Sequence, residues 1–499
     1  MCITNHTKFK GEIENYLRND LNCFDSKIDR TFFSLKVKTW LSRSNIIKKD
    51  GYHASHLLYV LFMLPLFKIN SVHSFCKKQW YHWSTSKKDT FYRFKHNTYR
   101  WRTFMYKLMS QISKALALEK GSIKERYFIV DDSVIAKRGK HIANVSYHYD
   151  HSIGRSVLGY CIVTLGMFNG KGFYPIDFAY NFGQTRHNDS PDEIIGDPRS
   201  ISGQRSFEAK NYSKLDLAVM MIKRAIDNGF SARYVLFDSW YAWPAVIKKV
   251  RAIKDDLHVI CRLKENPSKY HYGGKRYRLS ELYQKVKSEL KKDHKTGLLL
   301  KRVTVKLPDC DQESIIVFTR GYREPKDDNL KGTKKTKKSK WDAFLCTDTR
   351  LHASSIIKKY IQRWPVEVCF KECKQLLGLG KEQSNSFNAQ VFSTTASFMR
   401  YSVISYLNET ERYGTFGRLF ESLVDDTAVS TYAQRLWDFF QGLFKTSFSK
   451  IFELFDIQEE FQPYLDSITQ ALKESTPIIG CETWVIISWT PRIFRRLRS

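Results

Sequence analysis

The sequence lacks a hydrophobic run long enough to cross a membrane. Its most apolar stretch is HLLYVLFMLPLF, residues 56–67, whereas a membrane-spanning helix needs about 20 consecutive apolar residues. The stretch also begins too far into the chain, and after too polar a start, to be a signal peptide. We therefore expect a cytoplasmic protein without a membrane partner.

The sequence also lacks a pattern of metal-binding or disulfide-forming cysteines. Its ten cysteines are scattered without a CxxC motif, and Cys369 and Cys373 are only one helical turn apart. This predicts reduced thiols rather than a disulfide framework or a zinc site. The spacing of His141, His148 and His151 matches no zinc pattern, so we expect their segment to be a structural or DNA-facing loop.

Acidic residues are too few to balance the basic ones. The 499 residues include 82 Lys and Arg against 51 Asp and Glu, which gives a formal net charge of +31. Such an excess favours a polyanionic partner, with nucleic acid ahead of a membrane surface. Aromatic residues make up 14% of the chain, which indicates a folded protein.

Two short apolar runs are each followed directly by aspartate. YFIV at residues 127–130 precedes Asp131 and Asp132, and YVLF at residues 234–237 precedes Asp238. Both runs have the β-branched and aromatic composition of buried strands, and we expect each strand to end where its aspartate begins. Further elements are predicted in this order: a strand hairpin at 156–168 and 172–180, a helix at 215–227, strands between 258 and 346, and a buried helix at 386–410.

Four polar residues share the stretch YIQRWPVEVCFKECK, residues 360–374. Tyr360, Arg363, Glu367 and Lys374 are offset by 0, 3, 7 and 14 residues. On one continuous helix these offsets would place the four side chains within about 60° of one another. A phenol, a guanidinium, a carboxylate and an ammonium group would then share one stripe.

Pro365 complicates this arrangement, because proline inside a helix removes a backbone donor and clashes with the preceding turn. The alternative is a helix that begins at Pro365, the position that proline favours, with Glu367 in its first turn. Such a helix would end near Gly378 or Gly380.

The polar quartet resembles the Tyr-Arg-Glu-Lys signature of the insertion-sequence-four family, a branch of the DDE transposases. All four residues and all three gaps match, and Trp364 and the downstream LLGLGKEQ, residues 376–383, are also typical of that family. The resemblance covers roughly residues 85–400. It implies an α/β fold in which a ribonuclease H-like mixed sheet with helices is interrupted by a β-rich insertion and flanked by helical regions.

Carboxylates from two strands and a later helix are the ligands that a two-metal phosphoryl-transfer site requires. Two Mg²⁺ ions, for which Mn²⁺ can substitute, need hard oxygen ligands converging from separate rigid elements. The resemblance makes Asp238 the second ligand and Glu367 the third. The first is Asp131 or Asp132, because neighbours on a strand point to opposite faces. The family pattern of Asp, any residue, then Ser or Thr favours Asp131, followed at the right distance by Ser133, and leaves Asp132 in reserve.

The resemblance also implies side chains that contact DNA. Tyr360, Arg363 and Lys374 would contact phosphates of the transposon end near the cut, and arginine would add a bidentate fork. Trp364 would either stack on an extruded base or belong to the core. The basic, aromatic segment 77–102 would either contact DNA or form amphipathic helices with its aromatics in the core.

The expected organisation is a catalytic domain interrupted by an insertion and flanked by helical regions. The predicted parts are a helical DNA-end-binding region at 1–120, the first part of the catalytic domain at 121–257, a β-rich insertion at 258–346, the second part of the catalytic domain with the signature helix at 347–400, and a helical, possible dimerisation region at 401–499.

The function implied is cut-and-paste DNA transposition. The protein would bind the terminal inverted repeats of its own element, cleave at the ends and join the 3′-hydroxyls to target DNA, as a homodimer in the synaptic complex and without a small-molecule substrate. A bacterial, nucleoid-associated location follows from the same resemblance. Two alternatives stay open: a catalytically inactive or repurposed DNA-binding protein derived from a transposase, and a nuclease of the same fold without strand transfer.

Overall fold

The computed structural model describes most of the chain, with gaps. The described residues are 27–78, 83–116, 123–151, 153–183, 199–308, 312–321, 341–429, 431, 443, 446–447 and 450. The chain forms two compact units, one made of Met1–Lys95 with Glu411–Ser499 and the other of His96–Thr410. None of the helices in the described ranges combines the length and apolar character that a membrane crossing requires.

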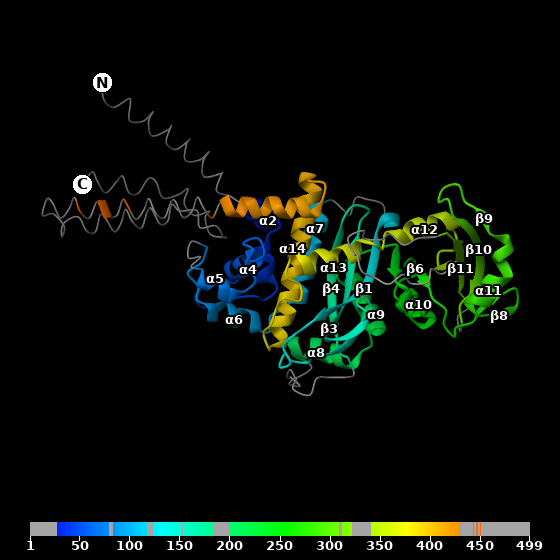
Figure 1. The fold of residues 1–499 in the computed structure, drawn as a ribbon, viewed down its shortest axis with the longest axis horizontal. Coiled ribbons are helices and arrows are strands. Elements are labelled where there is room, and N and C mark those ends of the chain that lie inside the picture. The colour runs from blue at the N-terminus through cyan, green and yellow to red at the C-terminus, as the bar shows by residue number, and fades with distance from the viewer. Residues whose placement is uncertain are drawn as a thin grey trace, which may run out of the picture. The chain divides into compact units, whose positions relative to one another are not determined.

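The first unit is helical wherever it is described. Its helices are α2 (Lys27–Ser34), α3 (Val37–Arg43), α4 (Ala54–Met63), α5 (Val72–Lys77), α6 (Lys88–His96), and residues 416–429 (Figure 1). Aromatic side chains fill its core, where Phe32 packs edge-on against Tyr59 and Phe62. Trp83 is fixed in this core because its Nε1 donates to Oγ1 of Thr431 at 3.0 Å.

The basic, aromatic segment 77–102 supplies core side chains. Trp83, Phe91, Phe94 and Trp101 are all buried. The core interpretation is therefore confirmed for these aromatics, while residues 79–82 lie outside the described part. The predicted DNA contact of the 1–120 region stays a prediction, and it would have to come from other side chains.

The second unit is built on a twelve-stranded sheet, shown in Figure 1. Its strands are β1 (Tyr127–Ala136), β2 (Ser146–Asp150), β3 (Arg155–Phe168), β4 (Phe173–Asn181), β5 (Tyr234–Phe237), β6 (His258–Leu263), β7 (Tyr270–Tyr272), β8 (Lys275–Tyr277), β9 (Lys291–Lys292), β10 (Leu299–Lys306), β11 (Glu313–Arg320) and β12 (Asp342–Cys346). The strand order is β2-β3-β1-β5-β6-β12-β11-β10-β7-β8, with β4 paired to β3 and β9 to β10.

The central strands have a ribonuclease H-like arrangement. β1, β5 and β6 are parallel neighbours, and the antiparallel hairpin of β3 and β4 extends the sheet on the other side of β1. The buried runs of β1, β5 and β6 are continuous and apolar, as is typical of strands covered on both faces. The predicted α/β fold class, with its mixed sheet, is confirmed.

Strand β1 continues past its aspartates. The prediction that the strand ends at residue 130 is wrong, because Asp131 and Asp132 pair with Thr164 and Val163 of β3 and the strand runs on to Ala136. Only the parallel ladder with β5 stops here, at the pair Val130–Phe237. The two carboxylates therefore lie where β1 loses one neighbour and keeps the other.

The predicted hairpin is present, with its turn at Asn169-Gly170-Lys171. Gly170 has φ of 91°, a left-handed conformation that glycine adopts without strain. Oδ1 of Asn169 accepts from the backbone N–H groups of Lys171 and Gly172 at 2.9 and 2.8 Å. These contacts fix the turn and hence the register of β3 against β4.

The β-rich segment predicted at 258–346 joins the same sheet. β6 pairs in parallel with β5, and β12 pairs antiparallel with β6, so that β11 and β10 continue outward from the central strands. β10 alternates buried and exposed residues along its last part, in keeping with a strand covered on one face. The low-complexity stretch 331–340 lies outside the described residues.

Helices pack against the sheet of the second unit. They are α7 (Trp101–Ala115), α8 (Ile201–Asn211), α9 (Lys214–Asp227), α10 (Pro244–Arg251), α11 (Leu279–Val286), α12 (Ala353–Ile361), α13 (Pro365–Gln375) and α14 (Phe387–Glu411), with 3-10 turns η2 (Ile123–Glu125), η3 (Ser239–Tyr241) and η4 (Lys287–Glu289). α7 and α8 pack on β4, α9 on β3 and β4, α10 on β6, and α13 on β1 and β4. The predicted helices near 215–227 and 386–410 are thus confirmed.

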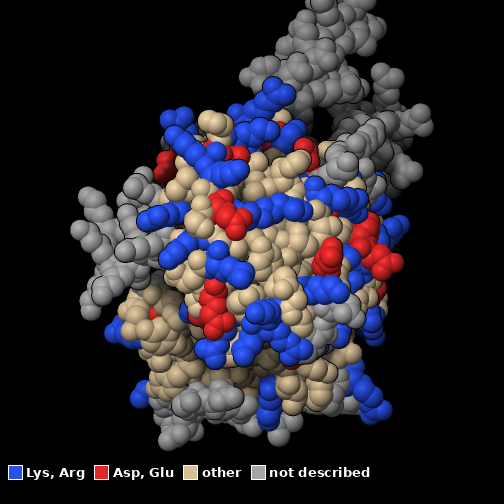
Figure 2. All heavy atoms as spheres, turned by 90° about the vertical axis from the view of Figure 1, so that its right-hand side faces the viewer, with Lys and Arg blue, Asp and Glu red and all other residues tan. Residues whose placement is uncertain are grey.

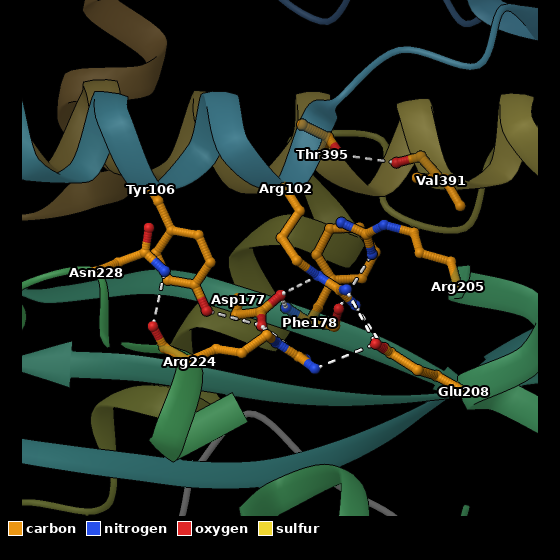
Figure 3. Close-up of polar contacts among 10 residues, drawn as sticks. All are labelled: Arg102, Tyr106, Asp177, Phe178, Arg205, Glu208, Arg224, Asn228, Val391 and Thr395. Atoms are coloured by element: carbon orange, nitrogen blue, oxygen red, sulfur yellow. Dashed lines mark hydrogen bonds and ion pairs between the residues drawn. The ribbon is translucent and has the colours of Figure 1, made fainter. Parts of the chain in front are cut away.

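A buried ionic network ties four of these elements together, as Figure 3 shows. Asp177 of β4 accepts from Arg102 of α7 at 3.2 Å, Tyr106 of α7 at 2.9 Å and Arg224 of α9 at 3.0 Å. Both arginines also pair with Glu208 of α8. Burial alone would raise the pKa of Asp177, but the nearby arginines lower it to about 2. A charge shared among α7, α8, α9 and β4 stabilises their packing only while the whole set is present.

Candidate active site

An arginine joins two of the predicted ligand carboxylates. Nη1 of Arg363 donates to Oδ2 of Asp131 at 2.9 Å, and Nη2 donates to Oε1 of Glu367. The guanidinium is only 7% exposed, whereas the carboxylate of Glu367 is 36% exposed. Strand β1 and helix α13 are thereby linked through a buried cation.

The charges of three other acidic side chains act on Asp131. Burial raises the pKa of Asp131 to about 8, Arg363 opposes this rise, and the negative charges of Asp132, Asp238 and Glu367 add to it. A carboxyl group surrounded by other carboxylates favours a cation or a proton. Asp131, at the end of the ladder between β1 and β5, is therefore within electrostatic range of the other three acids.

Asp132 has different partners from Asp131, as the alternation of side chains along a strand requires. Its Oδ1 accepts from the hydroxyl of Tyr241 at 2.7 Å, and its Oδ2 accepts from Nζ of Lys214 at 3.0 Å and from Sγ of Cys161 at 3.2 Å. The carboxylate of Asp132 is therefore already occupied by donors from three other elements.

Asp238 directly follows β5, as predicted, and opens the η3 turn. It is half-buried, and its charge acts on both Asp131 and Arg363. Its position at the carboxyl end of β5, beside the carboxylate of the neighbouring parallel strand, follows from the strand order.

The signature stretch is divided between two helices. α12 ends at Ile361, and α13 begins at Pro365, which occupies a first-turn position. This confirms the second of the two predicted arrangements and excludes one continuous stripe. Gly378 and Gly380 follow the helix with φ of 79° and 85°, as expected of its C-terminal residues.

Tyr360 and Arg363 are both buried and contact each other between α12 and α13. The ring of Tyr360 is 2% exposed and packs against Phe344 of β12, with ring centroids 4.9 Å apart. The guanidinium of Arg363 lies over the ring of Tyr360, 5.9 Å from its centroid. Burial lowers the pKa of Arg363, but Tyr360, Asp131 and Glu367 outweigh this effect and raise it, so the side chain stays charged.

Lys374 and Trp364 are both half-buried on α13 or at its start. Burial lowers the pKa of Lys374, and Asp150 opposes this effect. Lys374 is two turns beyond Glu367 on the same helix, so the ammonium and the carboxylate share one side of α13. The predicted roles of both residues toward DNA stay predictions.

The ligand chemistry fits a divalent cation. Within the described ranges, no group of three or more His, Cys, Asp or Glu side chains comes close enough together to hold a metal ion. However, Arg363 already places a cation between Asp131 and Glu367, and the pKa of Asp131 reflects further unbalanced negative charge beside it. Carboxylate oxygens are the ligands that Mg²⁺ and Mn²⁺ prefer, so Asp131, Asp238 and Glu367 would hold the ion once Arg363 released Asp131 and Glu367.

His141, His148 and His151 do not form a metal site. Nε2 of His148 lies 2.9 Å from Oγ of Ser146, and burial lowers the pKa of His148 to about 4. His151 instead lies against the exposed ring of Trp240, with centroids 5.4 Å apart. The segment also contains strand β2, which the sequence did not predict.

Three residues of the site were missed from the sequence. Lys214, Tyr241 and Cys161 all donate to Asp132. Tyr241 is only three residues beyond Asp238, which is a usable signal. Lys214 and Cys161 are far from Asp132 and Asp238 in the sequence, and no sequence pattern marks them as part of the site.

A surface hollow of about 510 Å³ lies away from these carboxylates. Among the residues lining it are Arg233, which precedes β5, and His258, which begins β6. It is thus at the opposite ends of the parallel strands from Asp238. Its charged groups are paired with one another, as Asp348 is with Arg350 and Tyr234.

Basic side chains outnumber acidic ones at the end of the unit formed by β8, β9 and β10. Figure 2 shows this face with Lys and Arg side chains spread over it and fewer Asp and Glu. Its exposed basic residues between 275 and 306 are Lys275, Arg276, Arg278, Lys285, Lys287, Lys291, Lys292, Lys295, Arg302 and Lys306. Such a surface suits contact with a phosphate backbone.

Two overlapping stretches of the chain match known family models. Residues 58–278 match the family model described as DDE superfamily endonuclease, and residues 206–402 match the model described as transposase DDE domain. The first match contains Asp131 and the second contains Glu367, while both contain Asp238. These matches support a DNA transposase of the DDE class.

A solved transposase structure is also similar to this chain. It is described as the synaptic complex of piggyBac transposase with hairpin DNA, with a TM-score of 0.43 and 12% sequence identity over 83% of this chain and 81% of that one. No curated protein sequence matches the chain.

Proposed function

We propose that this protein is a DNA transposase of the insertion-sequence-four family that cuts and joins the ends of its own element. The observation that carries the proposal is the pairing of Arg363 with both Asp131 and Glu367 at the end of the β1–β5 ladder, where β5 leads into Asp238. The two family matches and the net charge of +31 support it.

In this proposal Asp131, Asp238 and Glu367 hold two divalent ions, as DDE nucleases generally do. The ions would lower the pKa of the attacking water or 3′-hydroxyl and stabilise the leaving 3′-oxygen. The protein's own contribution is to hold the three carboxylates on separate rigid elements, so that little reorganisation accompanies the reaction.

Arg363 would change partners during the reaction. Both Nη atoms of its guanidinium donate to carboxylates, so a bidentate contact to DNA requires at least one of these hydrogen bonds to break. Two oxygens of a phosphate can accept from both arms of a guanidinium, as the two oxygens of a carboxylate can. We propose that Arg363 moves to a phosphate near the cut when the ions take its place. Tyr360, buried beneath it, would then orient Arg363, and Lys374 would contact a neighbouring phosphate.

The remaining parts of the proposal concern partners. The protein would bind terminal inverted repeats and target DNA, and two copies would hold two ends together. The basic face of β8, β9 and β10 would contact the DNA backbone. The predicted dimerisation region at 401–499 is described mainly in its first part, and the basic residues of PRIFRRLRS, 491–499, lie outside the described residues.

The test is cleavage of a duplex that carries the element's terminal repeat, with Mg²⁺ or Mn²⁺. Wild type should cut at the repeat boundary, Glu367→Ala should bind the duplex without cutting it, and Glu372→Ala, a carboxylate on the same helix, should still cut. If all three proteins bind and none cuts, the DNA-binding alternative replaces this proposal. Strand transfer with pre-cut ends then separates a transposase from a nuclease, because only the transposase joins them.

A further inference from the structure

The carboxylate of Asp132 accepts from donors on three other elements at the edge of the site, yet it is not one of the proposed metal ligands. It lies on β1, and its donors come from η3, from α9 and from β3. Its side chain is 17% exposed. Three donors within 3.2 Å leave this carboxylate little freedom to rotate.

One of these donors is linked to the second metal ligand. Tyr241 is the last residue of η3, the turn that Asp238 opens immediately after β5. Its ring is 1% exposed and stacks on Phe237, with centroids 5.7 Å apart and planes at 18°. The hydroxyl of Tyr241 is therefore at a fixed position relative to the backbone of Asp238.

The hydrogen bond between Asp132 and Tyr241 lies just beyond the end of a backbone ladder. The parallel pairing of β1 and β5 ends at Val130 and Phe237, one residue before Asp131 and Asp238. Past this point the separation of the two strands is no longer set by backbone hydrogen bonds between them. The hydrogen bond of 2.7 Å from Tyr241 to Asp132 joins the two segments again, after Asp131 on one and after Asp238 on the other.

We infer that Asp132 and Tyr241 are positioning residues that set the separation of the metal ligands Asp131 and Asp238. This inference rests on the proposed function. Along the chain, each ligand lies between the last backbone pair, Val130–Phe237, and the hydrogen bond from Tyr241 to Asp132. Lys214 balances the charge of Asp132 and holds its second oxygen, so that the first stays available to Tyr241.

The test compares two phenol deletions. Tyr241→Phe removes the hydroxyl and keeps the ring on Phe237. Tyr106→Phe is the matched control, because it also removes a buried hydrogen bond from tyrosine to aspartate in the same unit, but at Asp177 (Figure 3). Mn²⁺ binding to the full chain without DNA is measured by electron paramagnetic resonance, together with thermal stability and the Mn²⁺ dependence of end cleavage.

Tyr241→Phe should bind Mn²⁺ about 10-fold more weakly, since outer partners of metal ligands affect affinity on this scale. Its cleavage should recover toward the wild-type rate at saturating Mn²⁺. Tyr106→Phe should melt at a lower temperature with unchanged Mn²⁺ affinity. Asp132→Asn, which keeps an acceptor for Tyr241, should bind Mn²⁺ more tightly than Asp132→Ala. Adding Tyr241→Phe to Asp132→Ala should weaken binding no further.

Equal Mn²⁺ affinity in wild type and Tyr241→Phe would overturn the inference and leave the proposed function intact. Additive losses in the double variant would overturn it too. If Asp132→Ala does not fold, Tyr241→Phe and its control still decide the question. A wild type that binds no Mn²⁺ overturns both the inference and the proposed function.

Discussion

At the residue scale, the proposed site depends on which groups Arg363 pairs with. Arg363 neutralises Asp131 and Glu367 in this structure, and the proposed chemistry needs those oxygens for metal ions. A guanidinium presents its donors in a rigid planar fork, whereas an ammonium is a compact point charge on a flexible stem, so the two basic side chains are not equivalent here.

Arg363→Lys should therefore keep binding of the terminal repeat within a few-fold and lose about 100-fold in cleavage rate, the scale found when a preorganised donor is removed. Gel-shift and cleavage assays measure the two effects separately. The control is Arg350→Lys, since Arg350 is an exposed arginine paired with a carboxylate in the same unit. Cleavage by Arg363→Lys at the wild-type rate would contradict the role given to the guanidinium.

The neighbouring aspartates of β1 should respond differently to the same substitution. Asp131→Asn removes a proposed metal ligand and should lower cleavage by at least about 1,000-fold, since metal ligation supplies several kcal/mol of transition-state stabilisation. Asp132→Asn keeps an acceptor for Tyr241 and should retain measurable cleavage. The rate constants of both variants at one Mn²⁺ concentration test this; the reverse order would make Asp132 the ligand.

At the scale of elements, the sequence predicted where strands and helices lie better than where they end. The run YFIV predicts a strand, but charged residues are poor strand formers, so Asp131 and Asp132 suggested its end. Pairing with β3 overrides that preference. By contrast, the break at Pro365 was predictable, because the ring of proline restricts the chain locally and does not depend on distant partners.

The network around Asp177 is the element-scale feature that the sequence did not indicate. Its members come from α7, β4, α8 and α9, and only the fold brings them together. A lone aspartate in the apolar run GFYPIDFAY gives no sign of two arginine partners more than 40 residues away on each side.

Asp177→Asn should lower the free energy of unfolding at pH 7 by about 3 kcal/mol, because it leaves arginines buried without their partner. The loss should shrink in acid. The pKa of Asp177 is about 2, below its usual 3.8, so its ionised form stabilises the fold above about pH 4. That contribution, about 2 kcal/mol, disappears as the pH falls toward 2.

Urea unfolding at pH 7 and at pH 3 measures this difference between wild type and Asp177→Asn. Glu289→Gln is the control, because Glu289 pairs with Lys301 at an exposed site of the same unit and such pairs contribute little. A loss of stability that is the same at both pH values would contradict the ionic account of the network.

At the scale of the whole molecule, the pairing of strands far apart in the chain could not be predicted from the sequence. Strands expected as a separate insertion continue the central sheet through β6 and β12. Their pairing joins residues far apart in the chain, and local patterns carry no information about it. Among the candidate ligands, Asp238 and Glu367 were predicted from the family resemblance, whereas the effect of their charges on Asp131 became visible only in the fold.

Net charge makes a prediction at the same scale. A protein with a charge of +31 should bind duplex DNA with an affinity that falls linearly with the logarithm of salt concentration. We expect a slope of about −4 or steeper, as for proteins with several phosphate contacts. Fluorescence anisotropy between 50 and 300 mM salt, roughly the range in which such slopes are measured, tests this. An affinity independent of salt would contradict a backbone-contacting basic surface.

The most direct test of the central claim is end cleavage by wild type and Asp238→Ala, with binding of the same duplex measured alongside. Asp238 is the best choice because it follows a buried strand and lies outside the Arg363 bridge, so its loss leaves that contact in place. The account predicts metal-dependent cleavage at the repeat boundary by wild type, and binding without cleavage by Asp238→Ala. Cleavage by Asp238→Ala at the wild-type rate would contradict it.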